Sequence, residues 1–267
     1  MAELFGVSRS GFYKFLKRMS EGLKRYDEHI ISLIEETWKK SRETYGALRL
    51  LKSVKQADVS YGLRRVRKIM KSLKIQGRQD VKFRVMTTDS RHNEKTAPDL
   101  VKRNFSPERK NEIWVSDVTY IKKAEGWLYL CVIIDLFSRK AVSWKVSERN
   151  DARLVADSIE KGVQSRNPPK GLIFHSDRGS NYCAKEVQEI LKNSGIRRSN
   201  SRKGNCWDNA VSESFFGSLK RELEYNVFYD IEDAERELEN HIDEFYNEFR
   251  MHSSIGYMSQ NEYERAA

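Results

Sequence analysis

A β-strand with an acidic residue at its centre is predicted for the stretch Ile113-Trp114-Val115-Ser116-Asp117-Val118-Thr119-Tyr120-Ile121. Its apolar and β-branched residues favour a strand, and Asp117 points to the same face as Val115 and Thr119. A carboxylate buried on that face without a partner costs free energy and tends to protonate. We therefore expect Asp117 to serve a function or to meet a counter-charge.

Further strand and helix patterns follow this stretch. Residues 127–137 and 140–146 are β-rich and separated by short breaks, which predicts an antiparallel meander with the first strand. Shorter strands are predicted at 171–176 and 196–199. This order predicts an α/β fold with an RNase H-like catalytic core, in which a three-stranded antiparallel meander and two further strands are flanked by helices. The helices are expected at 151–165, from Ser180 onward, at 209–225 and at 231–250.

The N-terminal region predicts helices joined by short turns. Residues 2–15 resemble the turn and second helix of a helix-turn-helix, with Gly6 at the turn and Ser8 as the helix cap. Phe12 and Phe15 are expected to face a core. Further helices are predicted over 27–53 and 61–74.

The helix predicted over 61–74 has a strongly basic face. Five positive side chains, with no negative one among them, lie opposite its apolar residues. A solvated charged face is the alternative, but the excess of positive charge favours contact with phosphates. These residues are Arg64, Arg65, Arg67, Lys68 and Lys71.

Positive charge is concentrated in the first part of the chain. Residues 1–110 hold 27 basic and 13 acidic side chains, whereas residues 111–267 hold 22 and 26, and the whole chain carries +10. A basic, helical N-terminal half indicates nucleic acid more than membrane. We predict a helical, helix-turn-helix-like DNA-binding region at 1–75, a basic linker at 76–110 and a catalytic core with C-terminal helices at 111–267.

Composition excludes several classes of protein. No run approaches the apolar length of a membrane span and no signal peptide is recognisable, so we expect a cytoplasmic protein without membrane contact. The cysteines are far apart and show no metal-ligand spacing, which argues against a disulfide framework and a zinc module. They are Cys131, Cys183 and Cys206.

A second acid ends a short predicted strand, in His175-Ser176-Asp177-Arg178-Gly179-Ser180-Asn181-Tyr182. Asp-x-Gly after a strand is also common turn chemistry, which is the alternative to a functional role. In the predicted topology, however, this strand lies beside the one that carries Asp117. We therefore expect Asp177 to lie close to Asp117.

The helix predicted at 209–225 offers a third acid. Asp208 lies at its cap, where backbone N–H groups engage it. Glu222 points about 180° away from Glu213, and Glu224 lies about 16 Å further along the axis, whereas Lys220 falls within about 20° of Glu213. We expect Glu213 to complete the site, and Glu222 and Glu224 to be dispensable for activity.

Three converging carboxylates need a counter-charge. Each pair repels by roughly 1 kcal/mol in water and by about 4 kcal/mol at an effective dielectric constant of about 20. Oxygen-only ligands suit Mg²⁺ or Mn²⁺. Two such ions, about 3.5–4 Å apart, clamp the attacking and leaving oxygens of an in-line phosphoryl displacement. Asp117, Asp177 and Glu213 therefore predict a two-metal site acting on a phosphodiester.

Other polar residues near this site have simpler interpretations. Asp135 ends the second strand and is expected to brace a turn more than to bind metal. His175 is expected to be a hydrogen-bond partner more than a general base. Phe215 and Phe216 are expected in the core.

The motifs named above resemble, in order and spacing, the DDE transposases of the insertion-sequence three (IS-three) family, relatives of retroviral integrases. Thirty-five residues lie between Asp177 and Glu213, the spacing of that family. The resemblance covers nearly the whole chain, as an OrfB-type chain with an integrase catalytic core. The chain differs from the residues usual in that family at Asn181, Asn200 and Gln260. Its further motifs are Ile134-Asp135-Leu136-Phe137-Ser138-Arg139, Ser201-Arg202-Lys203-Gly204-Asn205-Cys206-Trp207-Asp208-Asn209-Ala210 and Glu213-Ser214-Phe215-Phe216.

The resemblance implies strand cleavage at transposon ends, followed by attack of the 3′-hydroxyl on another phosphodiester. It implies two Mg²⁺ ions (or Mn²⁺) per site and double-stranded DNA, both terminal inverted repeats and target, as the partner. It also implies a homo-oligomer on DNA and an upstream-frame protein or frameshift fusion. The residues expected to contact DNA are Lys220, Arg178, Arg202 and Lys203, with Arg64, Arg65 and Lys68.

Two other functions remain open at this point. A catalytically inactive DNA-binding regulator or remnant would keep the fold, but the presence of all three acids argues against it. A non-recombining RNase H-like nuclease would share the site chemistry. A general nuclease, however, does not need a basic helical N-terminal region for the recognition of specific DNA ends.

Overall fold

The computed structural model divides the chain into two compact units, Met1–Gln79 and Asp80–Ala267. Among the residues it describes, every helix is too short or too polar to traverse a lipid bilayer. The residues described are 2, 4, 6–21, 26–57, 60–78, 96–102, 104–201 and 210–267.

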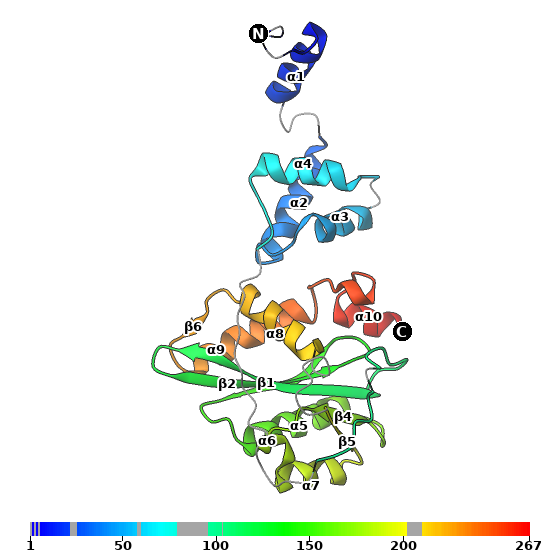
Figure 1. Cartoon of the computed structure of the whole chain (residues 1–267), viewed down its shortest axis with the longest axis vertical. Helices are drawn as coiled ribbons and strands as arrows, with labels where there is room; N and C mark the ends of the chain where they lie inside the picture. The colour runs from blue at the N-terminus through cyan, green and yellow to red at the C-terminus, as the bar shows by residue number, and fades with distance from the viewer. Residues whose placement is uncertain are drawn as a thin grey trace. The chain divides into compact units, whose positions relative to one another are not determined.

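The N-terminal unit is helical (Figure 1). The range 27–53, predicted to be helical, holds two separate helices, because the chain turns after Ser41. Arg42 and Glu43 have φ angles of 56° and 62°, a left-handed conformation that a right-handed helix does not continue. The helices are α1 (Arg9–Glu21), α2 (Glu28–Lys40), α3 (Ala47–Gln56) and α4 (Leu63–Leu73).

α1 begins as predicted but does not pack as predicted. Ser8 Oγ accepts a hydrogen bond from Gly11 N at 3.1 Å, and Gly6 has a φ of 62°. Phe12 is half-buried, but Phe15 is 54% exposed, so the expectation that it faces a core is wrong. The apolar residues of α2, α3 and α4 bury one another instead; they are Ile30, Ile34, Leu50, Val54, Val66 and Ile69.

The second unit is built on a six-stranded sheet with the order β3-β2-β1-β4-β5, and β6 pairs with β1. β1, β2 and β3 are antiparallel, whereas β4, β5 and β6 run parallel to their neighbours. The predicted meander with two further strands is confirmed, and β6 is an addition. The strands are β1 (Ile113–Lys123), β2 (Trp127–Asp135), β3 (Ala141–Ser147), β4 (Ile173–Ser176), β5 (Arg197–Asn200) and β6 (Val227–Phe228).

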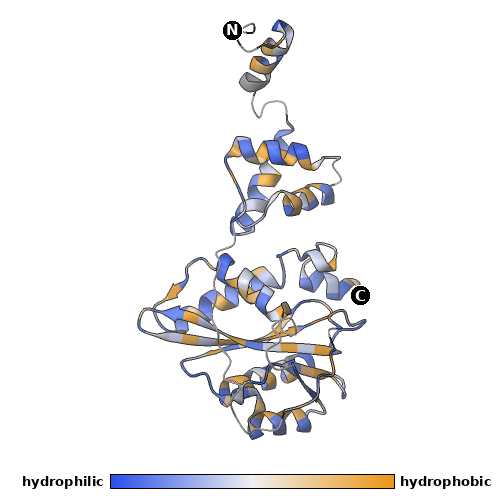
Figure 2. Ribbon diagram, viewed as in Figure 1, coloured by the Kyte–Doolittle hydropathy of each residue, from blue (hydrophilic) through white to orange (hydrophobic). Residues whose placement is uncertain are grey.

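Helices cover both faces of this sheet (Figure 1), and apolar residues line the strands and the helix sides against them (Figure 2). One face carries α5 (Ala152–Arg166), α6 (Ser180–Cys183) and α7 (Lys185–Asn193). The other face carries α8 (Ala210–Glu222), α9 (Ile231–Glu239), the π-helical segment η3 (Asn240–Tyr246), the 3-10 turn η4 (Ser253–Ile255) and α10 (Gln260–Ala266).

The alternation of side chains along β1 decides on which face of the sheet Asp117 lies. Val115 and Ile121 belong to the core that contains Leu219 of α8, whereas Trp114 belongs to the core that contains α5. Asp117 has the parity of Val115 and Ile121 and therefore faces α8.

Candidate active site

Asp117 in β1 and Asp177, directly after β4, occupy equivalent positions along two neighbouring parallel chain segments. The last pair in register between β1 and β4 is Val115 and His175, and each aspartate follows two residues later. Adjacent strands lie about 4.8 Å apart, and residues two apart on a strand share a face. The register therefore brings the two acids alongside each other.

The loop that carries Asp177 is fixed by hydrogen bonds. Gly179 N donates to Asp177 Oδ1 at 2.9 Å, and Asn200 Nδ2 donates to the Asp177 carbonyl oxygen at 2.8 Å. A Cβ at Gly179 would come within 2.6 Å of Asn181 Oδ1 and 3.1 Å of Asp177 Oδ1, so any larger residue there would have to displace these side chains. The amide of Asn200 thus fixes the backbone at Asp177.

Asn200 also holds a segment that precedes the core. Its Oδ1 accepts a hydrogen bond from Ala97 N at 2.7 Å, and Leu100 N donates to Ser199 Oγ at 2.9 Å. Val101 is buried with the sheet core. The last part of the stretch predicted as a linker is therefore packed on the catalytic unit.

Negative charge is crowded around Asp117. Its Oδ1 accepts a hydrogen bond from Val118 N at 2.8 Å. Burial is the main cause that raises the pKa of Asp117 to about 8, and the charges of Asp177 and, more weakly, Glu213 raise it further. The hydrogen bond from Val118 N acts in the opposite direction and lowers this pKa. Asp177 and Glu213 thus both lie within electrostatic reach of Asp117.

Glu213 lies on the exposed side of α8, in its first turn. Phe215, Phe216 and Leu219 are buried against the sheet, which confirms the two phenylalanines as core. Lys220, seven residues after Glu213, falls within about 20° of the same direction. Burial lowers the pKa of Lys220. The helix thus presents an acid and a base along one side.

The opposite side of α8 carries a buried ion pair that the sequence prediction missed. Arg250 Nε lies 2.8 Å from both carboxylate oxygens of Glu222, and His241 Nε2 lies 3.4 Å from the same group. Burial alone would raise the pKa of Glu222, but Arg250 and His241 lower it to about 2. Glu222 points away from Glu213 as predicted, and it is a buried charge paired inside the fold; that it is dispensable for activity stays a prediction.

The donor chemistry of the three acids fits a hard divalent cation. Asp117, Asp177 and Glu213 offer only carboxylate oxygens, the ligands that Mg²⁺ prefers. Burial and the neighbouring acids raise the pKa of Asp117, and a bound cation would offset both effects. As placed, however, no three His, Cys, Asp or Glu side chains among the described residues are close enough together to hold a metal ion.

The residues predicted to contact DNA have different surroundings. Arg178 Nε donates to the Ser201 carbonyl oxygen at 2.8 Å, which ties the Asp177 loop to the end of β5. Arg64, Arg65 and Lys68 are exposed on α4. Arg202 and Lys203 lie outside the described residues, as do Asn205, Trp207 and Asp208.

Two further polar residues support the site from inside the fold. Asp135 is fully buried and accepts hydrogen bonds from Asn111 N at 2.7 Å and Phe137 N at 2.9 Å, so it braces the turn after β2. Burial raises its pKa to about 6. His175 is buried, with Nδ1 2.8 Å from Ser199 Oγ, so it joins β4 to β5.

Comparison with known proteins adds independent information. Residues 107–206 and 194–259 match the integrase core domain family, and residues 25–83 match the HTH-like domain family. A simian T-cell lymphotropic virus intasome chain, in complex with a regulatory subunit of PP2A, shares the fold with a TM-score of 0.51 and 16% identity. That match covers 84% of this chain and 72% of the viral one.

Curated relatives match along nearly their whole length. An uncharacterised 31 kDa protein of insertion element IS600 from Shigella sonnei is 40% identical, over 97% of this chain and 95% of its own. Transposase InsF of insertion sequence IS3A from Escherichia coli is 32% identical, over 99% and 92%. The IS904 transposase of Lactococcus lactis is 34% identical, over 87% and 92%. This chain therefore belongs to the IS3 family of transposases, with an HTH-like region ahead of an integrase core.

Proposed function

We propose that this transposase cuts and joins DNA phosphodiester bonds with Asp117, Asp177 and Glu213 as its metal-binding catalytic acids. The observation that carries the proposal is the register of β1 and β4, which sets Asp117 beside Asp177. The pKa of Asp117, raised by burial and by both other acids, supports it, because such crowding costs stability and serves a cation site.

The metal in this proposal is Mg²⁺, with Mn²⁺ as a substitute, and two ions act in each site. When bound, such ions would neutralise the acids and stabilise the charge that develops on the phosphodiester. The chain's own part is to hold the acids in place. The Gly179 N–H and the Asn200 amide position the Asp177 loop, and the core side of α8 positions Glu213.

DNA binding is divided between the two units in this proposal. Residues 1–75 bind transposon ends through the basic face of α4, and residues 111–267 perform catalysis. The predicted linker, 76–110, connects them, with its last part packed on the core. Lys220, Arg178, Arg202 and Lys203 contact DNA near the site. The protein works as a homo-oligomer on double-stranded DNA, together with, or fused to, the product of an upstream frame.

Strand cleavage and strand transfer by acid variants test the catalytic assignment. Asp177→Asn and Glu213→Gln should abolish both reactions in Mg²⁺ while DNA binding and the melting temperature stay close to those of the wild type. Glu224→Gln is the matched control, because Glu224 is exposed just after α8 and the substitution removes the same charge. Cleavage that survives in Glu213→Gln but is lost in Glu224→Gln would refute the assignment of the third acid.

A further inference from the structure

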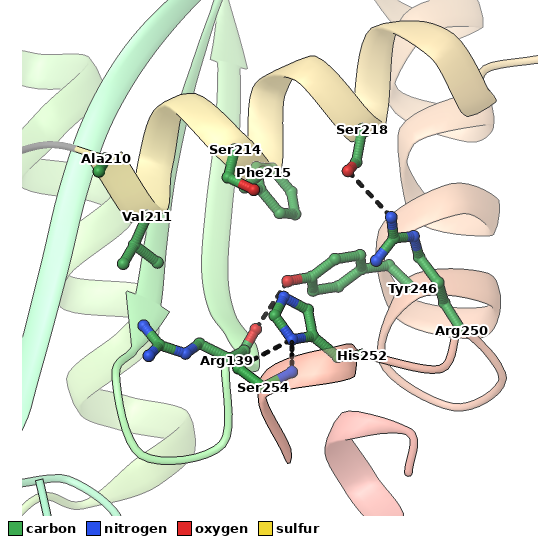
Figure 3. A pocket seen from close by; sticks show the side chains of 10 residues that line it. All are labelled: Arg139, Ala210, Val211, Ser214, Phe215, Ser218, Tyr246, Arg250, His252 and Ser254. Atoms are coloured by element: carbon green, nitrogen blue, oxygen red, sulfur yellow. Dashed lines mark hydrogen bonds between the residues drawn. The ribbon is translucent and has the colours of Figure 1, made fainter. Parts of the chain in front are cut away.

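A small pocket with both polar and apolar lining lies on the flank of α8, next to the turn that carries Glu213. It encloses about 180 Å³ and opens between α8 and the C-terminal segment (Figure 3). α8 contributes Ser214 and Ser218, and the C-terminal segment contributes His252 and Ser254. None of the described residues that line it is acidic. The pocket therefore offers hydrogen-bond donors without a carboxylate.

Arg139 brings a positive charge to this pocket from the turn between β2 and β3, and its guanidinium extends below Val211 (Figure 3). Its Nη2 donates to the Phe105 carbonyl oxygen at 2.8 Å. Its Nη1 is buried and has no acceptor among the described residues. A buried donor without an acceptor costs free energy, and more so when it is charged. Arg139 therefore has a donor to spare for an anion.

The backbone at Arg139 supports a role beyond packing. Its φ angle is 63°, in the left-handed region that glycine and asparagine occupy most easily. A long charged side chain at such a position carries backbone strain, and strain of this kind clusters at functional sites.

The other groups in the pocket have settled roles. Arg250 pairs with Glu222 and donates from Nη2 to Ser218 Oγ at 2.9 Å, so its charge is balanced (Figure 3). His252 Nδ1 accepts a hydrogen bond from Ser254 N at 3.3 Å and lies 2.9 Å from Ser254 Oγ. An incoming anion would meet the hydroxyls of Ser214 and Ser218 beside the guanidinium of Arg139.

We propose that this pocket binds a phosphate group of the DNA backbone close to the reacting bond, with Arg139 as the positioning residue that receives its charge. The proposal rests on the function proposed above. Ser214 directly follows Glu213, and consecutive side chains on a helix diverge by about 100°. The bound phosphate therefore belongs to a nucleotide near the reacting bond, and not to that bond itself.

Arg139→Asn tests the proposal, because asparagine suits the positive φ and removes the charge. The full chain is titrated with a fluorescein-labelled DNA duplex at increasing KCl, without divalent cations. The slope of log K against log salt should become shallower by about 0.9 for one lost phosphate contact. The control is Arg153→Gln, which removes equal charge from an exposed residue of α5, on the opposite face of the sheet, and should leave the slope unchanged.

Inorganic phosphate distinguishes the two sources of the anion. If phosphate raised the melting temperature of the wild type but not of Arg139→Asn, while both had the same DNA salt slope, the pocket would bind a free anion and the DNA contact would be refuted. Equal slopes without any phosphate effect would also refute it. These measurements need no catalysis, so a failure of strand cleavage would refute the proposed function and leave the slope result standing.

Discussion

Glu222 and Arg250 form a buried ion pair of 2.8 Å on the side of α8 that faces away from Glu213. The pair ties the end of α8 to the C-terminal segment, and His241 reaches the same carboxylate. The helix that carries Glu213 is thus anchored by charges that take no part in the proposed chemistry.

Glu222→Gln should lower the free energy of unfolding by about 3–5 kcal/mol, because it leaves the Arg250 charge buried without its partner. Urea denaturation of the purified chain measures this. Glu224→Gln, the exposed control, should change it by less than about 0.5 kcal/mol. Similar losses in both variants would show that the ion pair does not stabilise the fold.

Acid should remove the stabilisation that comes from Glu222. Its folded-state pKa of about 2 lies below its ordinary value of 4.5, so its contribution is complete above pH 4.5 and is lost as the pH falls toward 2. Unfolding free energies measured through this range should fall more steeply for the wild type than for Glu222→Gln. Parallel curves for the two proteins would contradict the depressed pKa.

Asp117→Asn should stabilise the protein in the absence of divalent cations. The folded pKa of about 8 lies above the ordinary 3.8, so the folded state keeps a proton that the unfolded chain releases, and stability falls as the pH rises through this interval. The variant should melt higher than the wild type at pH 8, by about 2–4 °C for each kcal/mol of relieved repulsion.

Mg²⁺ provides the complementary measurement on the same pair of proteins. An ion that binds only the folded state raises the melting temperature. Mg²⁺ should raise the melting temperature of the wild type, and it should raise that of Asp117→Asn much less. An equal gain in both would place the cation elsewhere.

Alanine at Arg64, Arg65 and Lys68 should weaken DNA binding without unfolding the N-terminal unit, because all three side chains are exposed on α4. The slope of log K against log salt should become shallower by about 2–3 units. Alanine at the exposed residues Lys39, Lys40 and Lys52, on the neighbouring helices of that unit, is the charge-matched control. An equal change in the control would mean that no particular face is used.

The arrangement of the proposed acids could be predicted because it depends on short-range patterns. The parity of β1 places Asp117 on the face toward α8, and the order of strands places Asp177 beside it. The helical period places Glu213 and Glu222 on opposite sides of α8. Each of these inferences needs only a few consecutive residues.

Other features depend on contacts that no local pattern records. Arg250 lies 28 residues after Glu222, and nothing in either segment shows that these two charges meet. β6 has only two residues, which are too few to show the alternation of polar and apolar side chains that indicates a strand. The turn at Arg42 and Glu43 contains neither glycine nor proline, so the end of α2 had no sequence signal.

Asn200 connects the chain ahead of the core with the loop of Asp177, since one end of its amide holds Ala97 and the other holds the Asp177 carbonyl oxygen. Asn200 therefore couples the backbone at residue 97 to the backbone of a proposed metal ligand, so a substitution that removes its amide would release both contacts together.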